Sequence, residues 1–157
     1  MKCIKNGGNA PDTICGILYR NDSQKCGDCL MSFTFNAHQG LIIVQAELTG
    51  PVGNAVLRLA LDTGATITLV NVEVLIAIGY DPAITSNLME VTTGSCVESV
   101  PCITLNKILA LGQTRTEFPI LAHTLPPSSG VGGVLGLDFF RGQTLSIDFR
   151  NGNLNLA

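Results

Sequence analysis

An acidic residue at the end of an apolar strand is the feature of this sequence that most limits its fold. In the stretch LRLALDTGATITLV, Leu57, Leu59 and Leu61 show the two-residue period of a strand with one buried face. Asp62 follows directly. Burying an ionised carboxylate without a partner is costly, so we expect Asp62 either to bind backbone amides in a turn before Gly64 or to do chemistry.

Short apolar runs separated by turn residues cover most of the chain, which contains 17 Gly and 7 Pro. They predict strands and turns rather than long helices. We expect one helix between an Asn71 cap and Gly79. We expect strands over residues 40–48, 54–61 and 65–70, a hairpin over 88–105 that turns near 93–95, two strands around Gly112, a strand ending at Gly136, and a last hairpin with a type I′ turn at Asn151 and Gly152. The predicted fold class is mostly β, with one or two short helices.

Charge and hydropathy exclude several classes of partner. The chain has 157 residues, a net charge of −3 and no cluster of Lys and Arg, so we expect no nucleic-acid partner. No apolar run approaches the roughly 18 residues of a membrane-spanning helix, so we expect no membrane partner. The N-terminus has no apolar signal segment, which favours a cytoplasmic protein.

Two regions of the chain differ in composition. Residues 1–39 hold four of the six cysteines and show little periodicity, so we expect a leader that need not be well ordered. Residues 40–157 are apolar and rich in turns, and we expect them to form one β domain. The leader cysteines are either free thiols or ligands of a zinc site. Cys26 and Cys29 have the spacing of one of the two cysteine pairs in such a site. The four are Cys3, Cys15, Cys26 and Cys29.

Four stretches, in this order, resemble the retropepsin-like aspartic proteases: LALDTGAT, EVTTGSC, VLGLDFF and LSIDF. The bacterial single-domain members are more similar than the retroviral ones, and the resemblance covers roughly residues 41–157. It implies the acid protease fold, a closed β-barrel with one lobe per chain. The resemblance also implies a polypeptide substrate and no cofactor. Because the chain carries Asp-Thr-Gly once and the family uses two, the resemblance implies a homodimer.

The resemblance assigns roles to individual residues. It implies that Asp62 is catalytic and that Thr63 links the two active-site loops across the dimer. Thr66 stands where retroviral members have Asp, and bacterial and pepsin-like members have a supporting hydroxyl near this position. The implied active-site loop is Thr63, Gly64, Ala65 and Thr66, the implied flap is Val91, Thr92, Thr93, Gly94 and Ser95, and Gly136 is the implied structural turn. We expect Asp138 to begin a helical turn rather than to act as a second acid.

The chemistry of such a dimer depends on a pair of carboxyl groups. Two carboxyls about 3 Å apart cannot both ionise, so they share one proton. One then acts as general base toward water and the other as general acid toward the substrate carbonyl. Gly64 can offer its amide to the carboxylate of Asp62, and the absence of a side chain lets the backbone pass close to it.

Other functions remain open from the sequence. A dimeric module with the same fold could bind an extended peptide in its groove without cutting it. A zinc-dependent adaptor that works through its cysteine-containing leader is a further alternative. The leader could also be removed by self-cleavage near residues 33–35. The chain has no G-x-S-x-G and no H-E-x-x-H sequence, which argues against a serine hydrolase and against a zinc protease.

Overall fold

The structure is a computed structural model that describes residues 31–92 and 97–157. In chain order its strands are β1 (Met31–Thr34), β2 (Ile42–Thr49), β3 (Asn54–Leu61), β4 (Leu69–Asn71), β5 (Leu88–Thr92), β6 (Val97–Ala110), β7 (Gln113–His123), β8 (Gly133–Leu135), β9 (Leu145–Asp148) and β10 (Asn153–Leu156). The helical elements are α1 (Val72–Ala77) and two 3-10 turns, η1 (Pro127–Ser129) and η2 (Leu137–Phe140). The mostly β fold with short helices that the sequence predicts is confirmed.

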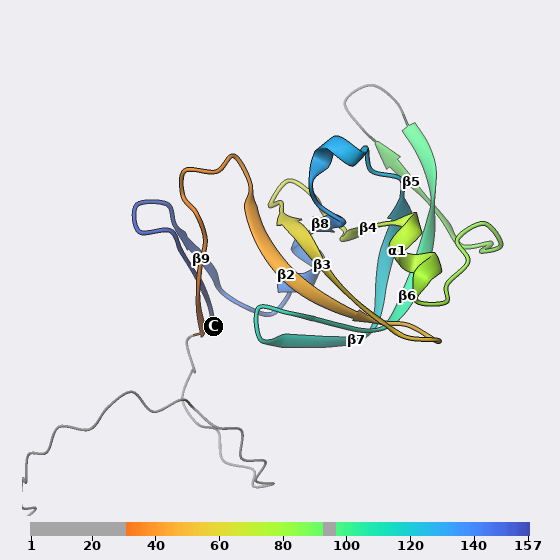
Figure 1. Ribbon diagram of the computed structural model, residues 1–157, viewed down its shortest axis with the longest axis horizontal. Helices are drawn as coiled ribbons and strands as arrows, with labels where there is room; N and C mark the ends of the chain where they lie inside the picture. Colours follow the sequence, from red (N-terminus) through yellow and green to blue (C-terminus); the bar gives the residue numbers. More distant parts are fainter. Residues whose placement is uncertain (1–30, 93–96) are drawn as a thin grey trace, which may run out of the picture.

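Six strands close into a barrel. Their order is β2-β3-β8-β4-β7-β6, and pairing between β2 and β6 completes the ring. The short strand β8 pairs in parallel with β3 and antiparallel with β4, so it lies between the two strands that flank the Asp62 loop. Figure 1 shows β2 and β3 crossing the middle of the view, with β6 on the right of the barrel.

The interior of the barrel is filled by aliphatic and phenylalanine side chains. Leu57, Leu59 and Leu61 of β3 are all buried, as their alternation predicts. Phe139 of η2 is fully buried and packs edge-on against both Phe118 and Phe140. Burying such side chains contributes about 1.5–3 kcal/mol each, which is the main term that holds the barrel closed.

A second sheet lies beside the barrel and joins the two ends of the described chain. β1 pairs with β10, and β10 pairs with β9, all antiparallel. Figure 1 shows β9 and its neighbours to the left of β2. Residues 31–39 thus belong with the folded domain, although we expected the domain to begin at residue 40. The leader cysteines lie outside the described residues.

The helix prediction is confirmed at both ends. The side chain of Asn71 accepts a hydrogen bond from the backbone N–H of Glu73, which is an N-cap. Gly79 follows the helix with φ +97°, a conformation that other residues adopt only with strain. No helix in the described part of the chain combines the length and the apolar character needed to cross a bilayer.

Two local predictions are wrong. Residues 65–68 do not form a strand with 69–71, because the Ala65 carbonyl and the Thr68 N–H bind η2, and only the Thr68 carbonyl bonds to a neighbouring strand, at Leu121 of β7. The last hairpin is closed by a four-residue loop, since its final pair is Asp148 with Asn153. Asn151 does not have the positive φ that a type I′ turn requires, whereas Gly152 does.

Candidate active site

Asp62 lies at the point where β3 leaves the barrel. Leu61 pairs with Leu135 of β8, and the backbone N–H of Asp62 donates to the carbonyl oxygen of Leu135 at 3.1 Å. The parallel pairing therefore extends to Asp62 and ends there. The side chain of Asp62 is exposed in the single chain. The buried leucines of β3 thus anchor an accessible carboxylate.

A tight turn orients this carboxylate. The backbone N–H of Gly64 donates to Asp62 Oδ1 at 2.8 Å, which is the contact expected from the sequence. The N–H of Ala65 donates to the carbonyl oxygen of Asp62 at 3.2 Å. A Cβ on Gly64 would lie 3.1 Å from Oδ1 of Asp62, closer than most real Cβ contacts. Glycine at this position therefore lets the amide reach the carboxylate.

The side chains of Thr63 and Thr66 have no such contacts within the described residues of one chain. Thr63 and Thr66 are exposed and Ala65 is half-buried. Among residues 31–92 and 97–157, neither threonine hydroxyl forms a hydrogen bond. The bond across a dimer that we expect for Thr63 requires a second chain, and the supporting role of Thr66 stays a prediction.

Thr68 and Asp138 clamp the end of the loop to η2. The backbone N–H of Thr68 donates to Oδ1 and Oδ2 of Asp138 at 3.0 and 2.9 Å, and the Thr68 hydroxyl donates to Oδ1 at 2.8 Å. Phe139 N–H donates to the same carboxylate at 2.9 Å. Thr68 is fully buried and is the only buried polar residue in the described chain.

Asp138 therefore positions the loop and is not free to act as a second acid. Its two oxygens already accept hydrogen bonds from Thr68 and Phe139. We expected Asp138 to begin a helical turn, but η2 begins one residue earlier, at Leu137, and Asp138 lies in its first turn. The sequence did not indicate its partner Thr68. The available signal was a threonine in an apolar run, where a buried hydroxyl needs a hydrogen-bond partner.

Gly136 lies where the two segments of the site approach each other most closely. Its N–H donates to the hydroxyl of Thr68 at 3.1 Å. A Cβ on Gly136 would meet the carbonyl carbon of Ile67 at 2.7 Å and the backbone N of Thr68 at 2.9 Å. Only glycine lets η2 pack directly on the backbone of the loop, and the N–H of Leu137 then reaches the carbonyl oxygen of Ala65 at 2.9 Å.

The β5–β6 hairpin packs against the same buried cluster as the loop. Its last described pair is Thr92 with Val97, and Thr93, Gly94 and Ser95 lie outside the described residues. Val91 packs with Ile67 against a small buried cluster that contains Cys102. Ile67 and Met89 line one pocket of about 300 Å³. The strands of the expected flap thus share a buried cluster and a pocket with the loop that carries Asp62.

The surface around the loop is partly apolar. Leu137 directly follows Gly136, and 43% of its surface is exposed although it lies beside the Asp62 loop. An exposed carboxylate and an exposed leucine on neighbouring segments form a surface that a second macromolecule could cover. One chain supplies a single candidate catalytic carboxyl group, because the carboxylate of Asp138 is occupied.

Comparison with known structures identifies the class of fold. A retropepsin-like aspartic protease from Rickettsia conorii is 18% identical, with a TM-score of 0.62 over 81% of this chain and 89% of that chain. The retroviral protease-like domain of Ddi1 from Leishmania major is 15% identical, with a TM-score of 0.50 over 74% of this chain and 91% of that domain. The barrel and its Asp62 loop therefore have the retropepsin-like fold.

The family follows from the sequence of the barrel itself. Residues 44–139, which run from β2 to η2, match the model of the aspartyl protease family. The match covers more than half of the chain and includes Asp62, Gly136 and Asp138. This chain belongs to the aspartyl protease family. A search of curated proteins found no match.

Proposed function

We propose that the protein is an aspartic endopeptidase whose active site forms at the two-fold axis of a homodimer, with Asp62 of each chain as the catalytic residue. The observation that carries this proposal is the exposed Asp62 carboxylate, held by the Gly64 amide at the open end of an aspartyl protease barrel. A single chain has one such group. A symmetric dimer places the same group on both sides of its axis, which supplies the pair.

The two carboxyls have different roles in hydrolysis, one as general base and the other as general acid. The ionised Asp62 removes a proton from a water molecule, and the water oxygen attacks the peptide carbonyl carbon. The protonated Asp62 of the partner subunit gives its proton to the carbonyl oxygen, which yields a tetrahedral intermediate. As the C–N bond breaks, the first Asp62 gives the proton it took from water to the leaving nitrogen. One hydroxyl of the intermediate returns its proton to the Asp62 carboxylate of the partner subunit, which yields the carboxylic acid and the amine and restores the shared proton.

The clamp between Thr68 and Asp138 supports this step by holding the loop in place. Small displacements of a catalytic group lower the reaction rate, because catalysis depends on the placement of the reacting atoms. We propose in addition that the β5–β6 hairpin is the flap and that Val91, Thr92, Thr93, Gly94 and Ser95 are its substrate-binding residues. A flap that closes over a bound peptide excludes water from the reacting groups.

Replacement of Asp62 by Asn tests the proposal. The amide cannot act as a general base, so peptide cleavage should fall by about 10²–10⁴-fold. Fold and dimer should remain, because Asn keeps the oxygen that accepts the Gly64 N–H. Cleavage of a peptide mixture by wild type and variant is followed by mass spectrometry.

Asp81→Asn is the matched control. Asp81 is also an exposed aspartate that accepts a backbone N–H in a turn, here from Ala83 at 3.0 Å. This variant should cleave at the wild-type rate. Cleavage by Asp62→Asn at the wild-type rate would show that the assignment is wrong.

The shared proton also predicts the pH profile of activity. One carboxyl must be ionised and the other protonated, so the rate should be bell-shaped in pH with its maximum on the acid side. Initial rates on one peptide across the pH range measure this. A flat profile into the alkaline range would exclude a shared proton.

A further inference from the structure

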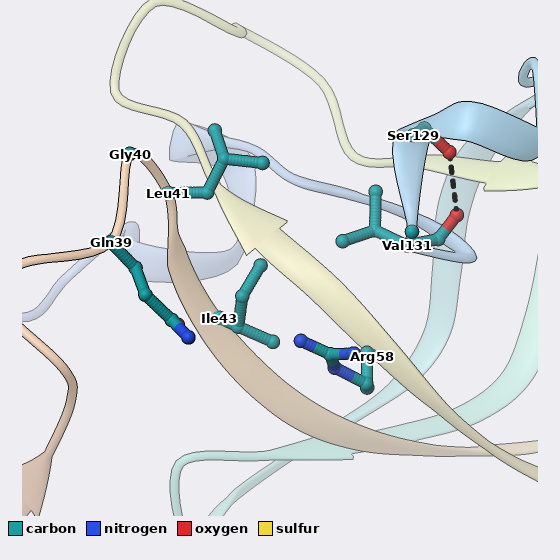
Figure 2. Close-up of a pocket in the computed structure, with 8 residues that line it drawn as sticks. Gln39, Gly40, Leu41, Ile43, Arg58, Ser129 and Val131 are labelled. Carbon is teal, nitrogen blue, oxygen red and sulfur yellow. Dashed lines mark hydrogen bonds between the residues drawn. The ribbon is translucent and has the colours of Figure 1, made fainter.

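A second pocket lies along β3, on the side of the barrel formed by β2, β3 and the segment that follows η1. It has a volume of about 260 Å³. Figure 2 shows the side chain of Arg58 beside Ile43 and Val131, with Leu41 at the upper edge. The hydroxyl of Ser129 donates to the carbonyl oxygen of Val131 at 3.2 Å, which holds one wall in place. The pocket thus has apolar walls and one cationic group.

The guanidinium of Arg58 has no partner within the described part of the chain. Neither a hydrogen bond nor an ion pair involves it there, and none of the residues that line the pocket carries a carboxylate. Arg115, in contrast, donates to the carbonyl oxygens of Phe139 and Arg141. Arg141 shares its pocket with Asp138. Arg58 is therefore the cation in a pocket whose electrostatics favour an anion.

The position of Arg58 relates this pocket to the catalytic residue. Arg58 lies in β3, which ends at Leu61, and Asp62 follows directly. Arg58 is exposed, whereas Leu57 and Leu59 on either side of it are buried. Four residues of strand span about 13 Å. A peptide bound in an extended conformation has nearly the same rise per residue, so about four of its residues cover the distance from the scissile bond to Arg58.

We propose that this pocket is a specificity site that takes a glutamate or aspartate side chain of the substrate, about three to five residues from the scissile bond. The inference rests on the proposed function, because it concerns the peptide that Asp62 would cut. The methylene groups of a glutamate pack against Ile43 and Val131. Its carboxylate binds the planar guanidinium of Arg58 through two parallel hydrogen bonds, the geometry that arginine favours.

Cleavage of a peptide library measures the preference directly. The library varies each position over Glu, Gln and Arg, and mass spectrometry gives the products. Wild type should favour Glu over Gln by about 10-fold at one position three to five residues from the cut, as expected for a hydrogen bond to a charged group. Arg58→Gln should remove this preference, and Arg58→Glu should reverse it in favour of Arg.

Lys107 offers a matched control for the change of charge. It lies on β6 opposite Thr49, at the far end of β2 from the pocket. Lys107→Glu makes the same change in net charge as Arg58→Glu and should leave the preference as in wild type. If both variants change it alike, or if wild type shows no preference for Glu at any of these positions, the inference is wrong.

A binding measurement separates this inference from the proposed function. The Asp62→Asn variant is mixed with the same library, retained peptides are recovered by size filtration, and their composition is determined. Enrichment of Glu that disappears in the Asp62→Asn, Arg58→Glu double variant supports the pocket even if wild type cuts nothing. If Glu is not enriched, the proposed specificity site is wrong, while cleavage that depends on Asp62 would still support the proposed peptidase function.

Discussion

Thr68 and Asp138 are 70 residues apart in the sequence, yet the backbone and side chain of Thr68 donate three hydrogen bonds to the Asp138 carboxylate. Thr68 ends the loop that begins at Asp62, and Asp138 lies in η2. The contact joins the loop between β3 and β4 to the turn that follows β8. The position of Asp62 therefore depends on a pair of residues that has no direct part in chemistry.

Removal of the Asp138 carboxylate should destabilise the fold. In Asp138→Ala the buried N–H and hydroxyl of Thr68 lose their acceptor, which should lower the free energy of unfolding by about 2–4 kcal/mol. Urea denaturation at a fixed protein concentration measures the change. Glu90→Ala removes an exposed carboxylate that has no hydrogen bond in the described chain, and should change the same quantity by less than about 0.5 kcal/mol. Equal effects would argue against the clamp.

A methyl group at Gly136 should separate the two segments of the site. Gly136→Ala places its Cβ against backbone atoms of Ile67 and Thr68, which cannot rotate away as a side chain would. We expect a loss of about 1–3 kcal/mol in unfolding free energy, together with loss of peptide cleavage. Gly53→Ala is the control, since nothing lies within 4 Å of a Cβ there. A Gly136→Ala protein as stable as Gly53→Ala would contradict the close approach.

A charge at Leu137 should weaken the proposed dimer without unfolding the chain. Leu137 is 43% exposed and its backbone binds the Asp62 loop, so a partner chain at the axis would cover it. Leu137→Glu should raise the dimer dissociation constant by about 10-fold or more, because the carboxylate loses water on association. Sedimentation equilibrium measures this. Ile84→Glu, at a residue that is 81% exposed, should leave the constant unchanged.

Hydrogen bonds to Asp148 in the last hairpin should make the stability of the fold depend on pH. The side chain of Asn151 donates to Asp148 at 2.6 Å and, with the backbone N–H of Asn151, holds the pKa of Asp148 below its ordinary value of 3.8. A depressed native-state pKa contributes stability that is complete above the ordinary value and is lost as pH falls through the lowered value.

Asn151→Ala should therefore lower the free energy of unfolding most at neutral pH and least in strong acid. Chemical denaturation of wild type and variant at neutral pH and at about pH 2 gives the two differences. In Asn87→Ala, the control, the exposed side chain has no carboxylate partner, so its effect should not change with pH. An Asn151→Ala effect that grows on acidification would contradict the assignment.

The sequence predicts those parts of the fold that local rules determine. The alternation of Leu57, Leu59 and Leu61 locates β3 because a half-buried strand has period two. Asn71 and Gly79 locate α1 because a cap and a left-handed glycine are local signals. The resemblance places Asp62 and Gly136 in one site because the two sequence stretches that contain them occur together.

What the sequence does not predict depends on contacts between distant residues. In residues 65–70 threonines alternate with apolar residues, as in a strand, yet Thr68 is buried and Ile67 lines a pocket. The backbone N–H of Thr68 binds Asp138 instead of a neighbouring strand, and no local pattern indicates this partner. The pairing of β1 with β10 is missed for the same reason, since it joins the two ends of the described chain.

The central claim, that two Asp62 carboxyls form one active site, is tested most directly by mixing subunits. Wild type and Asp62→Asn chains are combined in equal amounts, dissociated and reassociated, and peptide cleavage is compared with that of the same total amount of wild type. If both carboxyls are required, only dimers of two wild-type chains cut, and about one quarter of the activity remains, as expected from random pairing in a symmetric dimer. If about half remains, each chain works alone and the account is wrong.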